Sequence, residues 1–334
     1  MVVYHDSDLS NSSFLVTGGA GFIGSHIIEY LLVNGAKKVR ALDNFLTGLP
    51  ANIEMFRKFP QFEFVEGDIR NIDKCRLACE GIDYITHQAA LGSVPRSIKD
   101  PATSNDVNIG GFVNMITAAK DAGVKCFVYA SSSSVYGDEP NLPKIESRTG
   151  NLLSPYAVTK MNNEMYASVF FRLYGINVIG LRYFNVFGPR QDPNGPYAAV
   201  IPLFVDGILN NKPVFINGDG EQTRDFTFVE NAVQANIRGM LATNPKAFGE
   251  AYNVATGANF TVNFLYSSIR ELLEAKHEPT YREPRSGDIR NSLADISKAR
   301  NLLGYQPTQF FIEGLKNTVE YFKYQSVNWD RIII

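Results

Sequence analysis

The residues best placed to do chemistry are Tyr156 and Lys160, which stand four positions apart in the run Tyr156-Ala-Val-Thr-Lys160. In a helix this spacing puts both side chains on one face, one turn apart. A nearby ammonium favours the phenolate, so a tyrosine with a reference pKa of about 10 can act as a base near neutral pH. Ser132 lies in a serine run about two dozen residues upstream and can share the proton in transit. The pattern predicts a proton-transfer site.

A glycine-rich loop near the start of the chain predicts a dinucleotide site. Residues 17–24 read Thr-Gly-Gly-Ala-Gly-Phe-Ile-Gly, after an apolar run and before a helical pattern. Such glycines allow a tight turn and let backbone N–H groups approach a pyrophosphate at a helix N-terminus. About twenty residues on, the expected second strand ends at Asp43, where a carboxylate binds the adenosine ribose and disfavours a 2′-phosphate. We therefore predict NAD rather than NADP.

Strand and helix patterns alternate through the first half of the chain. Short apolar runs end near residues 16, 42, 65, 87, 130 and 181, and helical spacing covers 22–34, 71–80, 103–122 and 155–174. The alternation predicts an α/β fold, a Rossmann-type doubly wound parallel sheet with a smaller C-terminal α/β substrate lobe. We place the NAD-binding domain at 1–187, with a loose leader at 1–11, and the substrate-binding lobe mainly at 188–334. Segments around 225–255, including a strand at 225–229, are expected to return to the large domain.

Composition and charge exclude several classes of function. The 334 residues are 45% apolar and 20% charged, with a formal net charge of -2. This balance gives no electrostatic footprint for nucleic acid or a membrane surface. No apolar stretch reaches transmembrane length, and the polar start lacks a signal peptide's apolar core, so we expect a cytoplasmic protein. Cys75, Cys79, Cys126 and four scattered histidines do not form a metal-binding pattern.

Together, the glycine loop, Asp43, Ser134-Val-Tyr-Gly137 and the Tyr156/Lys160 pair resemble the extended short-chain dehydrogenase/reductases. Longer motifs at 91–97, 183–188 and 285–288 look most like the UDP-N-acetylhexosamine 4-epimerases of the UDP-glucose 4-epimerase family. The resemblance covers nearly all of residues 13–325. It implies reversible inversion at C4 through a 4-keto sugar, with tightly held NAD taking and returning the hydride. It also implies a homodimer through 103–122 and 155–174.

The resemblance also implies a role for each matching position. Tyr156 is the implied catalytic base and acid, Lys160 lowers its pKa and holds the nicotinamide ribose, and Ser132 bridges Tyr156 to the sugar 4-hydroxyl. The further residues implied to bind NAD are Gly18, Gly21, Phe22, Ile23, Gly24, Asp43, Asn44, Asp68, Ile69, Gln88, Ala90 and Tyr183. The further residues implied to bind the UDP-sugar are Gly92, Ser93, Ser133, Asn185, Ala199, Val200, Asn217, Arg224, Arg285, Asp288 and Ser292.

Three small residues favour an N-acetylated sugar. Galactose-type bacterial epimerases often carry a lysine where Gly92 stands and a tyrosine where Ser292 stands. With Ala199, these positions would leave room beside C2 for an N-acetyl group. We therefore predict UDP-GlcNAc/UDP-GalNAc over UDP-Glc/UDP-Gal. A 4-epimerase for the corresponding uronate stays open, because a C6 carboxylate needs only local contacts, for which Arg96 or Ser93 could serve.

Other activities of similar proteins need groups that are absent from this sequence. Sugar-nucleotide 4,6-dehydratases of this kind need an Asp-Glu pair where Ser132 and Ser133 stand, and UDP-glucuronate decarboxylases typically carry a glutamate in the same segment. A non-catalytic scaffold that binds NAD is the remote alternative. The intact serine, tyrosine and lysine set argues against it.

Overall fold

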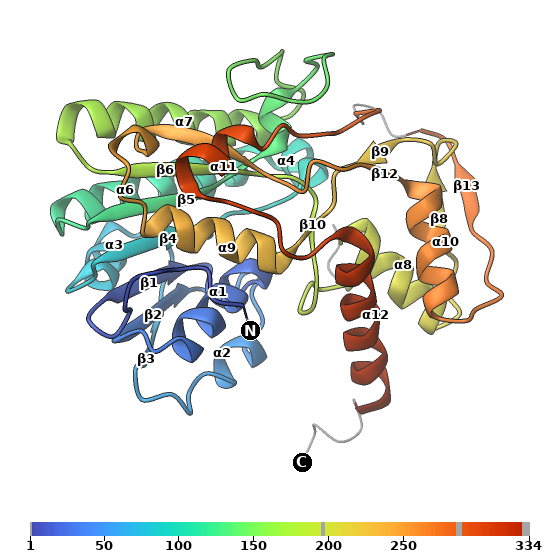
Figure 1. Cartoon of the computed structure of the whole chain (residues 1–334), viewed down its shortest axis with the longest axis horizontal. Helices are drawn as coiled ribbons and strands as arrows, with labels where there is room; N and C mark the ends of the chain where they lie inside the picture. Colours follow the sequence, from blue (N-terminus) through green and yellow to red (C-terminus); the bar gives the residue numbers. More distant parts are fainter. Residues whose placement is uncertain (1, 195–197, 285–288, 329–334) are drawn as a thin grey trace.

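The computed structural model describes residues 2–194, 198–284 and 289–328, and its largest element is a parallel seven-stranded sheet (Figure 1). The strands are β1 (Ser13–Thr17), β2 (Lys38–Asp43), β3 (Phe62–Glu66), β4 (Tyr84–His87), β5 (Cys126–Ser132), β6 (Val178–Tyr183) and β11 (Glu250–Val254). Their order is β11-β6-β5-β4-β1-β2-β3, and every pairing is parallel. The chain order reverses beside β1, where ligands bind in such sheets. The predicted Rossmann-type fold is confirmed.

Helices cover both faces of this sheet. One layer holds α1 (Phe22–Val33), α9 (Val229–Met240) and α11 (Ser297–Leu303), and the other holds α3 (Ile72–Cys79), α6 (Gly111–Asp121) and α7 (Pro155–Tyr174). Neighbouring residues of a strand face opposite layers, as Val16 and Leu15 do in β1. The strands are therefore apolar on both faces, which explains their continuous apolar runs in the sequence.

Shorter elements lie in the connections between these strands and helices. They are α2 (Ala51–Glu54), α4 (Val94–Lys99), α5 (Pro101–Asn105), the π-helical turn η1 (Asp106–Gly110) and the 3₁₀ turns η2 (Ser133–Tyr136) and η3 (Pro245–Ala247). The predicted helix over 103–122 is thus three consecutive pieces. A π turn inside a helix often marks a functional site, and Val107 of η1 lines the cavity described below.

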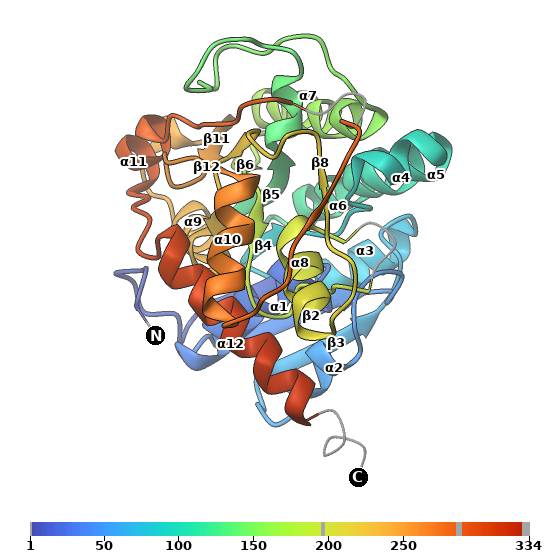
Figure 2. The same ribbon diagram turned by 90° about the vertical axis from the view of Figure 1, so that its right-hand side faces the viewer.

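A small lobe stands beside the sheet and faces the viewer in Figure 2. Its elements are β7 (Val186–Phe187), α8 (Val200–Leu209), β8 (Phe215–Asn217), β9 (Thr223–Arg224), β10 (Thr227–Phe228), β12 (Phe260–Thr261), α10 (Val262–Leu272), β13 (Thr280–Arg282) and α12 (Phe311–Asn328). Its strands pair two by two, β10 with β7, β12 with β9 and β13 with β8. A separate apolar cluster, in which Phe187, Phe228 and Phe311 make edge and face contacts, forms its core.

The predicted strand at 225–229 does not join the large sheet. The two residues of β10 pair with β7, because Phe226 and Phe228 are buried in the small-lobe core. Instead β11 completes the large sheet beside β6, with Tyr252 and Val254 buried in the cluster around α9. The apolar alternation at 225–229 therefore predicted the wrong strand: the segment that returns to the large sheet is Glu250–Val254.

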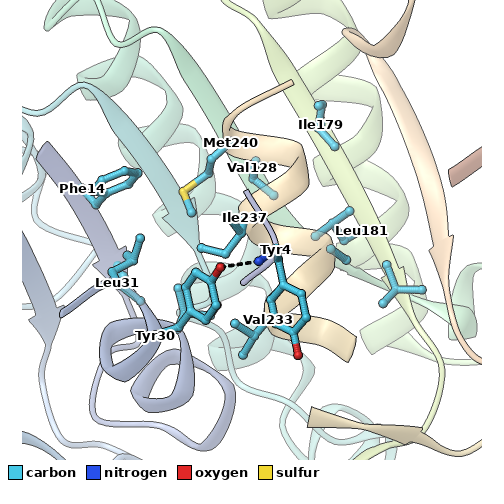
Figure 3. Close-up of a cluster of buried hydrophobic side chains, with 14 of the residues drawn as sticks. Tyr4, Phe14, Tyr30, Leu31, Val128, Ile179, Leu181, Val233, Ile237 and Met240 are labelled. Carbon is cyan, nitrogen blue, oxygen red and sulfur yellow. Dashed lines mark hydrogen bonds between the residues drawn. The ribbon is translucent and has the colours of Figure 1, made fainter. Parts of the chain in front are cut away.

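The expectation of a loose leader is wrong for residues 2–11. Tyr4 and Leu9 are buried, and the Tyr4 ring stacks on Tyr30 of α1 with centroids 5.3 Å apart. The Tyr4 amide also donates to the Tyr30 hydroxyl at 2.6 Å (Figure 3). Tyr4 thereby docks this segment against α1 and beside Val233 of α9, and Leu9 is buried in the same apolar cluster.

The structure adds two observations on other classes of function. In the described ranges no helix is long and apolar enough to cross a bilayer, and no group of three or more His, Cys, Asp or Glu side chains is placed to hold a metal ion. Cys75, Cys79 and Cys126 are buried free thiols, and burial raises the pKa of each to about 12. They are packing residues rather than nucleophiles.

Candidate active site

The glycine loop forms a backbone cradle at the start of α1. A Cβ at Gly18 would lie 2.7 Å from the Ala89 nitrogen, and one at Gly24 would lie 2.2 Å from the Gly18 carbonyl oxygen. Gly18 also has a φ of +68°, which side chains disfavour. Gly21, the N-cap residue, offers no side-chain acceptor to the first turn of α1. The backbone amides of the first turn of α1 are therefore available to an acceptor outside the helix, and a pyrophosphate is such an acceptor.

Two carboxylates lie at the ends of β2 and β3. Asp43 accepts hydrogen bonds from the amides of Ala20 and Phe45, at 2.9 and 2.8 Å, so it also fixes the glycine loop. Burial raises the pKa of Asp43, and these amides oppose the shift. Asp68 accepts from the Asn44 side chain at 2.9 Å and pairs with Arg70 at 2.7 Å, which lowers the pKa of Asp68 to about 2.

The catalytic residues predicted from the sequence come together between β5 and α7. Lys160 is buried and its Nζ donates to the Ala130 carbonyl at 2.7 Å, while lying 5.8 Å from the Tyr156 ring centroid. Burial lowers the pKa of Lys160 to about 8. The Ser132 hydroxyl faces the side chain of Tyr156 and favours its phenolate, which lowers the Tyr156 pKa. Burial outweighs that effect and raises the Tyr156 pKa, so the lowering expected from the sequence is not found in the protein alone.

A buried polar network supports the cavity floor. Gln88 donates to Thr86 at 2.7 Å and to Asn236 at 3.0 Å, and it accepts from the Tyr183 hydroxyl at 3.1 Å. Asn236 in turn donates to the Tyr183 hydroxyl at 2.7 Å. Neither Thr86 of β4 nor Asn236 of α9 was predicted. Asn236 comes from a helix far from the other site residues in the sequence, so no local pattern marks it. The network holds Gln88 and Tyr183 at the cavity wall.

A cavity of about 430 Å³ runs along the carboxyl ends of the strands. The predicted residues that line it are Gly18, Gly21, Phe22, Ile23, Gly24, Asp43, Asn44, Asp68, Ile69, Gln88, Ala90, Gly92, Ser132, Tyr156, Lys160, Tyr183 and Asn185. Its size, the open amides of α1 and the carboxylate at the end of β2 fit a dinucleotide. The hydride-accepting end of NAD would then lie toward Tyr156, at the other end of the cavity from Asp43.

A second cavity, also of about 430 Å³, opens into the small lobe and shares Asn185 with the first. Val200, Asn217 and Arg224 line it as well, and Arg224 donates to the Thr223 carbonyl at 2.8 Å. Arg282, which lies over the ring of Phe215, lines this cavity too and was not among the predicted site residues. Arg282 was not predicted because the sequence around it shows no strand or helix pattern; it ends β13, which is three residues long.

Four predicted substrate residues line neither cavity. Ser93 caps α4 through its hydroxyl, with a φ of +120°, and Ser133 begins η2. Ala199 is the exposed N-cap of α8, and Ser292 is buried with its amide donating to the Thr223 carbonyl at 3.2 Å, next to Arg224. Arg285 and Asp288 lie outside the described residues.

One further residue secures the cavity wall without having been predicted. Asn108 of η1 accepts from the Leu91 amide at 2.7 Å and donates to the Leu91 carbonyl at 3.1 Å. It also donates to Thr159, whose neighbour is Lys160. Asn108 thereby ties the segment before α4 to the catalytic helix.

Comparison with known proteins relates the chain to NAD-dependent epimerases. A family model, described as the NAD dependent epimerase/dehydratase family, matches residues 14–255. A UDP-glucose 4-epimerase of Mycolicibacterium smegmatis is 39% identical over 314 residues, covering 93% of this chain and 99% of that protein. A UDP-glucuronate 4-epimerase of Thermodesulfobacterium geofontis is 34% identical, covering 93% of this chain and 96% of that protein.

A similar solved structure is the UDP-N-acetylglucosamine 4-epimerase from Methanobrevibacter ruminantium in complex with UDP-N-acetylmuramic acid. It has a TM-score of 0.89 at 39% identity and covers 95% of this chain and 99% of that chain. The matched residues include the glycine loop, β2, β5, α7 and the network around Gln88. By its sequence, its sheet order and the site these build, the chain is a member of the NAD dependent epimerase/dehydratase family.

Proposed function

We propose that the protein interconverts UDP-GlcNAc and UDP-GalNAc by inversion at C4. That it is an NAD-dependent UDP-sugar 4-epimerase follows from the family and its relatives; the N-acetylated sugar is our more specific assignment. The observation that supports inversion at C4, rather than elimination, is the set of side chains around Tyr156. Among the described residues that line the first cavity, the carboxylates are Asp43 and Asp68, both at the β2–β3 end. The elimination chemistry of a dehydratase would need an acid close to Tyr156.

The residues of the site would act on the sugar 4-hydroxyl. Bound NAD supplies reversible hydride acceptance at C4. Tyr156 takes the hydroxyl proton, and Ser132, whose hydroxyl favours the Tyr156 phenolate, would align the two oxygens for that transfer. Lys160 keeps its ammonium at the cavity wall through Ala130 and offsets negative charge on Tyr156. Tyr156 returns the proton after the sugar has turned over, so the protein's net protonation is unchanged.

Anchoring the nucleotide while the sugar turns requires separate binding surfaces. Asn185 stands between the two cavities, and Arg224 and Arg282 supply positive charge in the second. A guanidinium matches a diphosphate in charge and geometry. We place the UDP part in the second cavity and the sugar near Tyr156. The mobile keto sugar would then pivot about a fixed diphosphate.

Space near the sugar supports the N-acetylated substrate. A Cβ at Gly92 would meet no atom within 4 Å, so the wall is open there. Ser292 places a small hydroxyl, rather than an aromatic ring, beside the strand that carries Arg224. Ser292 lines neither cavity, so the volume for a substituent larger than a hydroxyl is the open wall at Gly92, and Ser292 bears on it only through the strand that carries Arg224.

The deciding experiment incubates the purified protein, without added NAD, with UDP-GlcNAc, UDP-glucose or UDP-N-acetylglucosaminuronate and separates the products. We expect UDP-GalNAc from the first and much slower conversion of the other two. Preferential conversion of UDP-glucose or of the uronate would replace the proposed substrate. No conversion of any substrate, even with NAD added, would point to the non-catalytic scaffold.

We also propose that the protein forms a homodimer through α7. This helix exposes a row of apolar side chains, including Met165 at 61% and Leu173 at 70% of their full accessible area. Val158 and Val169 continue the row. Such an apolar stripe on an outer helix suits a two-fold helical interface. Sedimentation of the wild type and of Met165→Glu tests it, and a monomeric wild type would contradict it.

A further inference from the structure

Asp225 is a buried carboxylate at the point where the small lobe meets the large sheet. Its side chain has no exposed area, and it lines neither cavity of the site. Oδ1 accepts from the amide and the hydroxyl of Thr256, at 3.0 and 2.9 Å. Oδ2 accepts from the amides of Gly257 and Ala294, at 3.1 and 3.2 Å. Each oxygen therefore takes two donors, which only an ionised carboxylate can satisfy fully.

These donors come from segments that are distant in sequence. Thr256 follows β11, the last strand of the large sheet, whereas Ala294 belongs to the segment that carries Ser292. The backbone carbonyl of Asp225 accepts from the Asn185 side chain at 3.2 Å. The residue before it is Arg224. The side chain of Asp225 thus joins the segment after β11 to the segment of Ser292, while its backbone holds Asn185 and continues into Arg224.

The segment around Ser292 is held from both sides. The Thr223 amide donates to the Arg290 carbonyl at 3.0 Å, and the Ser292 amide donates back to Thr223 at 3.2 Å. On the other side, Lys144 from the long loop before α7 exchanges backbone hydrogen bonds with Leu293 and Asp295, at 2.7 and 2.9 Å. The bond from the Ala294 amide to Asp225 falls between Leu293 and Asp295, the two residues that Lys144 holds. It fixes the depth of the segment relative to the sheet.

The charge of Asp225 is maintained against its burial. Burial raises the pKa of Asp225 to about 6, and the four donors oppose that shift. At neutral pH the group is therefore the carboxylate that its donors require. A buried charge is retained only where its hydrogen bonds compensate for lost hydration.

We propose that Asp225 is a positioning residue for the sugar nucleotide, setting where Asn185, Arg224 and Ser292 stand relative to Tyr156. It acts through these residues, because it is sealed from both cavities. The inference rests on the proposed function only for the identity of the sugar. Its measurable consequence is on substrate binding and on sugar preference, with NAD binding unaffected, since the glycine loop and Asp43 lie at other strand ends.

The test compares Asp225→Asn with the wild type. An asparagine amide must point its N–H₂ group at two donors, whichever way it is turned, so two hydrogen bonds are lost and the attached segments move. We expect KM for UDP-GlcNAc and the Kd for UDP to rise about 10- to 100-fold, with a smaller change in kcat. The preference for UDP-GlcNAc over UDP-glucose should also shrink. The amount of NAD bound per chain should stay at the wild-type value.

Two further variants keep the test decisive. Thr256→Val removes one donor to Oδ1 at a partly exposed position, and it should raise KM and the Kd for UDP in the same direction by a smaller factor. Asp83→Asn is the matched control. Asp83 likewise accepts a backbone amide and a hydroxyl, both from Ser13, but at the opposite end of the sheet, so KM and sugar preference should not change.

The outcomes separate the two proposals. Folded Asp225→Asn and Thr256→Val proteins with wild-type KM, UDP affinity and sugar preference would overturn the role of Asp225. If Asp225→Asn does not fold, unchanged values in Thr256→Val alone would overturn it. A wild type that prefers UDP-glucose would overturn the proposed substrate only, because the rise in KM and in the Kd for UDP can be read with either sugar.

Discussion

Glu164 and Arg182 form a buried ion pair directly behind the strand end that carries Ser132. Arg182 donates two hydrogen bonds to Glu164, at 2.9 and 2.8 Å, and both side chains are largely inaccessible to water. Glu164 also accepts from the hydroxyl of Ser131 at 2.5 Å. The Arg182 guanidinium lies over the Tyr136 ring. Ser131, the neighbour of the proposed catalytic Ser132, is thus held by a polar cluster on the α7 side of β5.

Replacing Glu164 with Gln should destabilise the fold more than an ordinary polar substitution does. The change leaves the Arg182 guanidinium buried without its counter-charge, and breaking a buried pair in this way costs about 3–5 kcal/mol. The free energy of unfolding, measured by urea titration, should fall by that order. Glu250→Gln breaks the more exposed pair with Lys298 and should cost about 1 kcal/mol or less. Equal losses of unfolding free energy in the two variants would show that the Glu164–Arg182 pair stabilises the fold no more than the exposed pair does.

Tyr156→Phe should remove proton transfer and leave the fold intact. Loss of a general acid–base group lowers kcat by about 100- to 10,000-fold. NAD retention should persist, since the cradle of α1 and the carboxylate of Asp43 are untouched. Tyr166→Phe, at a 39% exposed position of the same helix, is the control and should turn over normally. A Tyr156→Phe enzyme with near-normal kcat would remove this tyrosine from the mechanism.

Asp43→Ala should weaken NAD binding and reduce discrimination against NADP. The carboxylate is the expected acceptor for the adenosine ribose and the repulsive group for a 2′-phosphate. Because Asp43 also holds the amides of Ala20 and Phe45, unfolding stability should fall as well. Glu66→Ala is the control, since Glu66 is paired with Asp43 in register and is exposed. Binding titrations with NAD and NADP decide, and an unchanged ratio of the two affinities would argue against the assignment.

Ser292→Tyr should depress turnover of acetylated sugars selectively. Ser292 is buried and lines neither cavity, so a ring there would have to push the strand that carries Arg224 toward the space assigned to the N-acetyl group. We expect kcat/KM for UDP-GlcNAc to fall about 10- to 200-fold, the range for a pocket that has become too small. Ser292→Ala, which keeps the space, should retain the preference. Equal losses on UDP-GlcNAc and UDP-glucose would refute the role of Ser292 in sugar choice.

His87 should make folding stability depend on pH. It is buried against Thr17 and Phe127, and burial lowers its pKa to about 3. The folded protein then binds fewer protons than the unfolded chain between about pH 6.5 and 3, so the stabilisation is complete above pH 6.5 and is lost as pH falls. At pH 5 this loss amounts to about 2 kcal/mol.

The matched variant for that measurement is His87→Asn, whose amide can keep the bond to Thr17. Urea unfolding at pH 7.5 and pH 5.0 should show a smaller acid loss in the variant than in the wild type. The difference should be close to the His87 contribution. If wild type and variant lose the same amount between these pH values, the acid sensitivity comes from other groups.

The sequence predicted the cofactor half of the site because its signals are local. The glycine loop, Asp43 and the Tyr156/Lys160 spacing each need only neighbours in the chain, and the parallel sheet brings them to one edge. The small lobe was predicted less well. Its strands are two or three residues long, too short for a period to show. Phe226 and Phe228 alternate as a strand should, yet their partner β7 is as short as β10.

Residues that act through distant partners were also beyond prediction. Asn236 reaches the cavity floor from α9, and Asp225 gathers amides from Thr256 and Ala294. Tyr4 is anchored by Tyr30, from which it is separated by 26 positions in the chain. In each case the tertiary contact, rather than a local pattern, determines the role.

The place of β11 in the large sheet has a consequence for synthesis of the chain. β6 pairs on one side with β5, but its other edge is filled only by β11, which emerges after β7, α8, β8, β9, β10 and α9. Until then, the hydrogen-bonding edge of Val178–Tyr183, an apolar strand, has no partner from the sheet. Unpaired apolar edges promote aggregation of nascent chains. Chains truncated before Glu250 should therefore associate through this edge, and chaperones should hold the growing protein until β11 has left the ribosome.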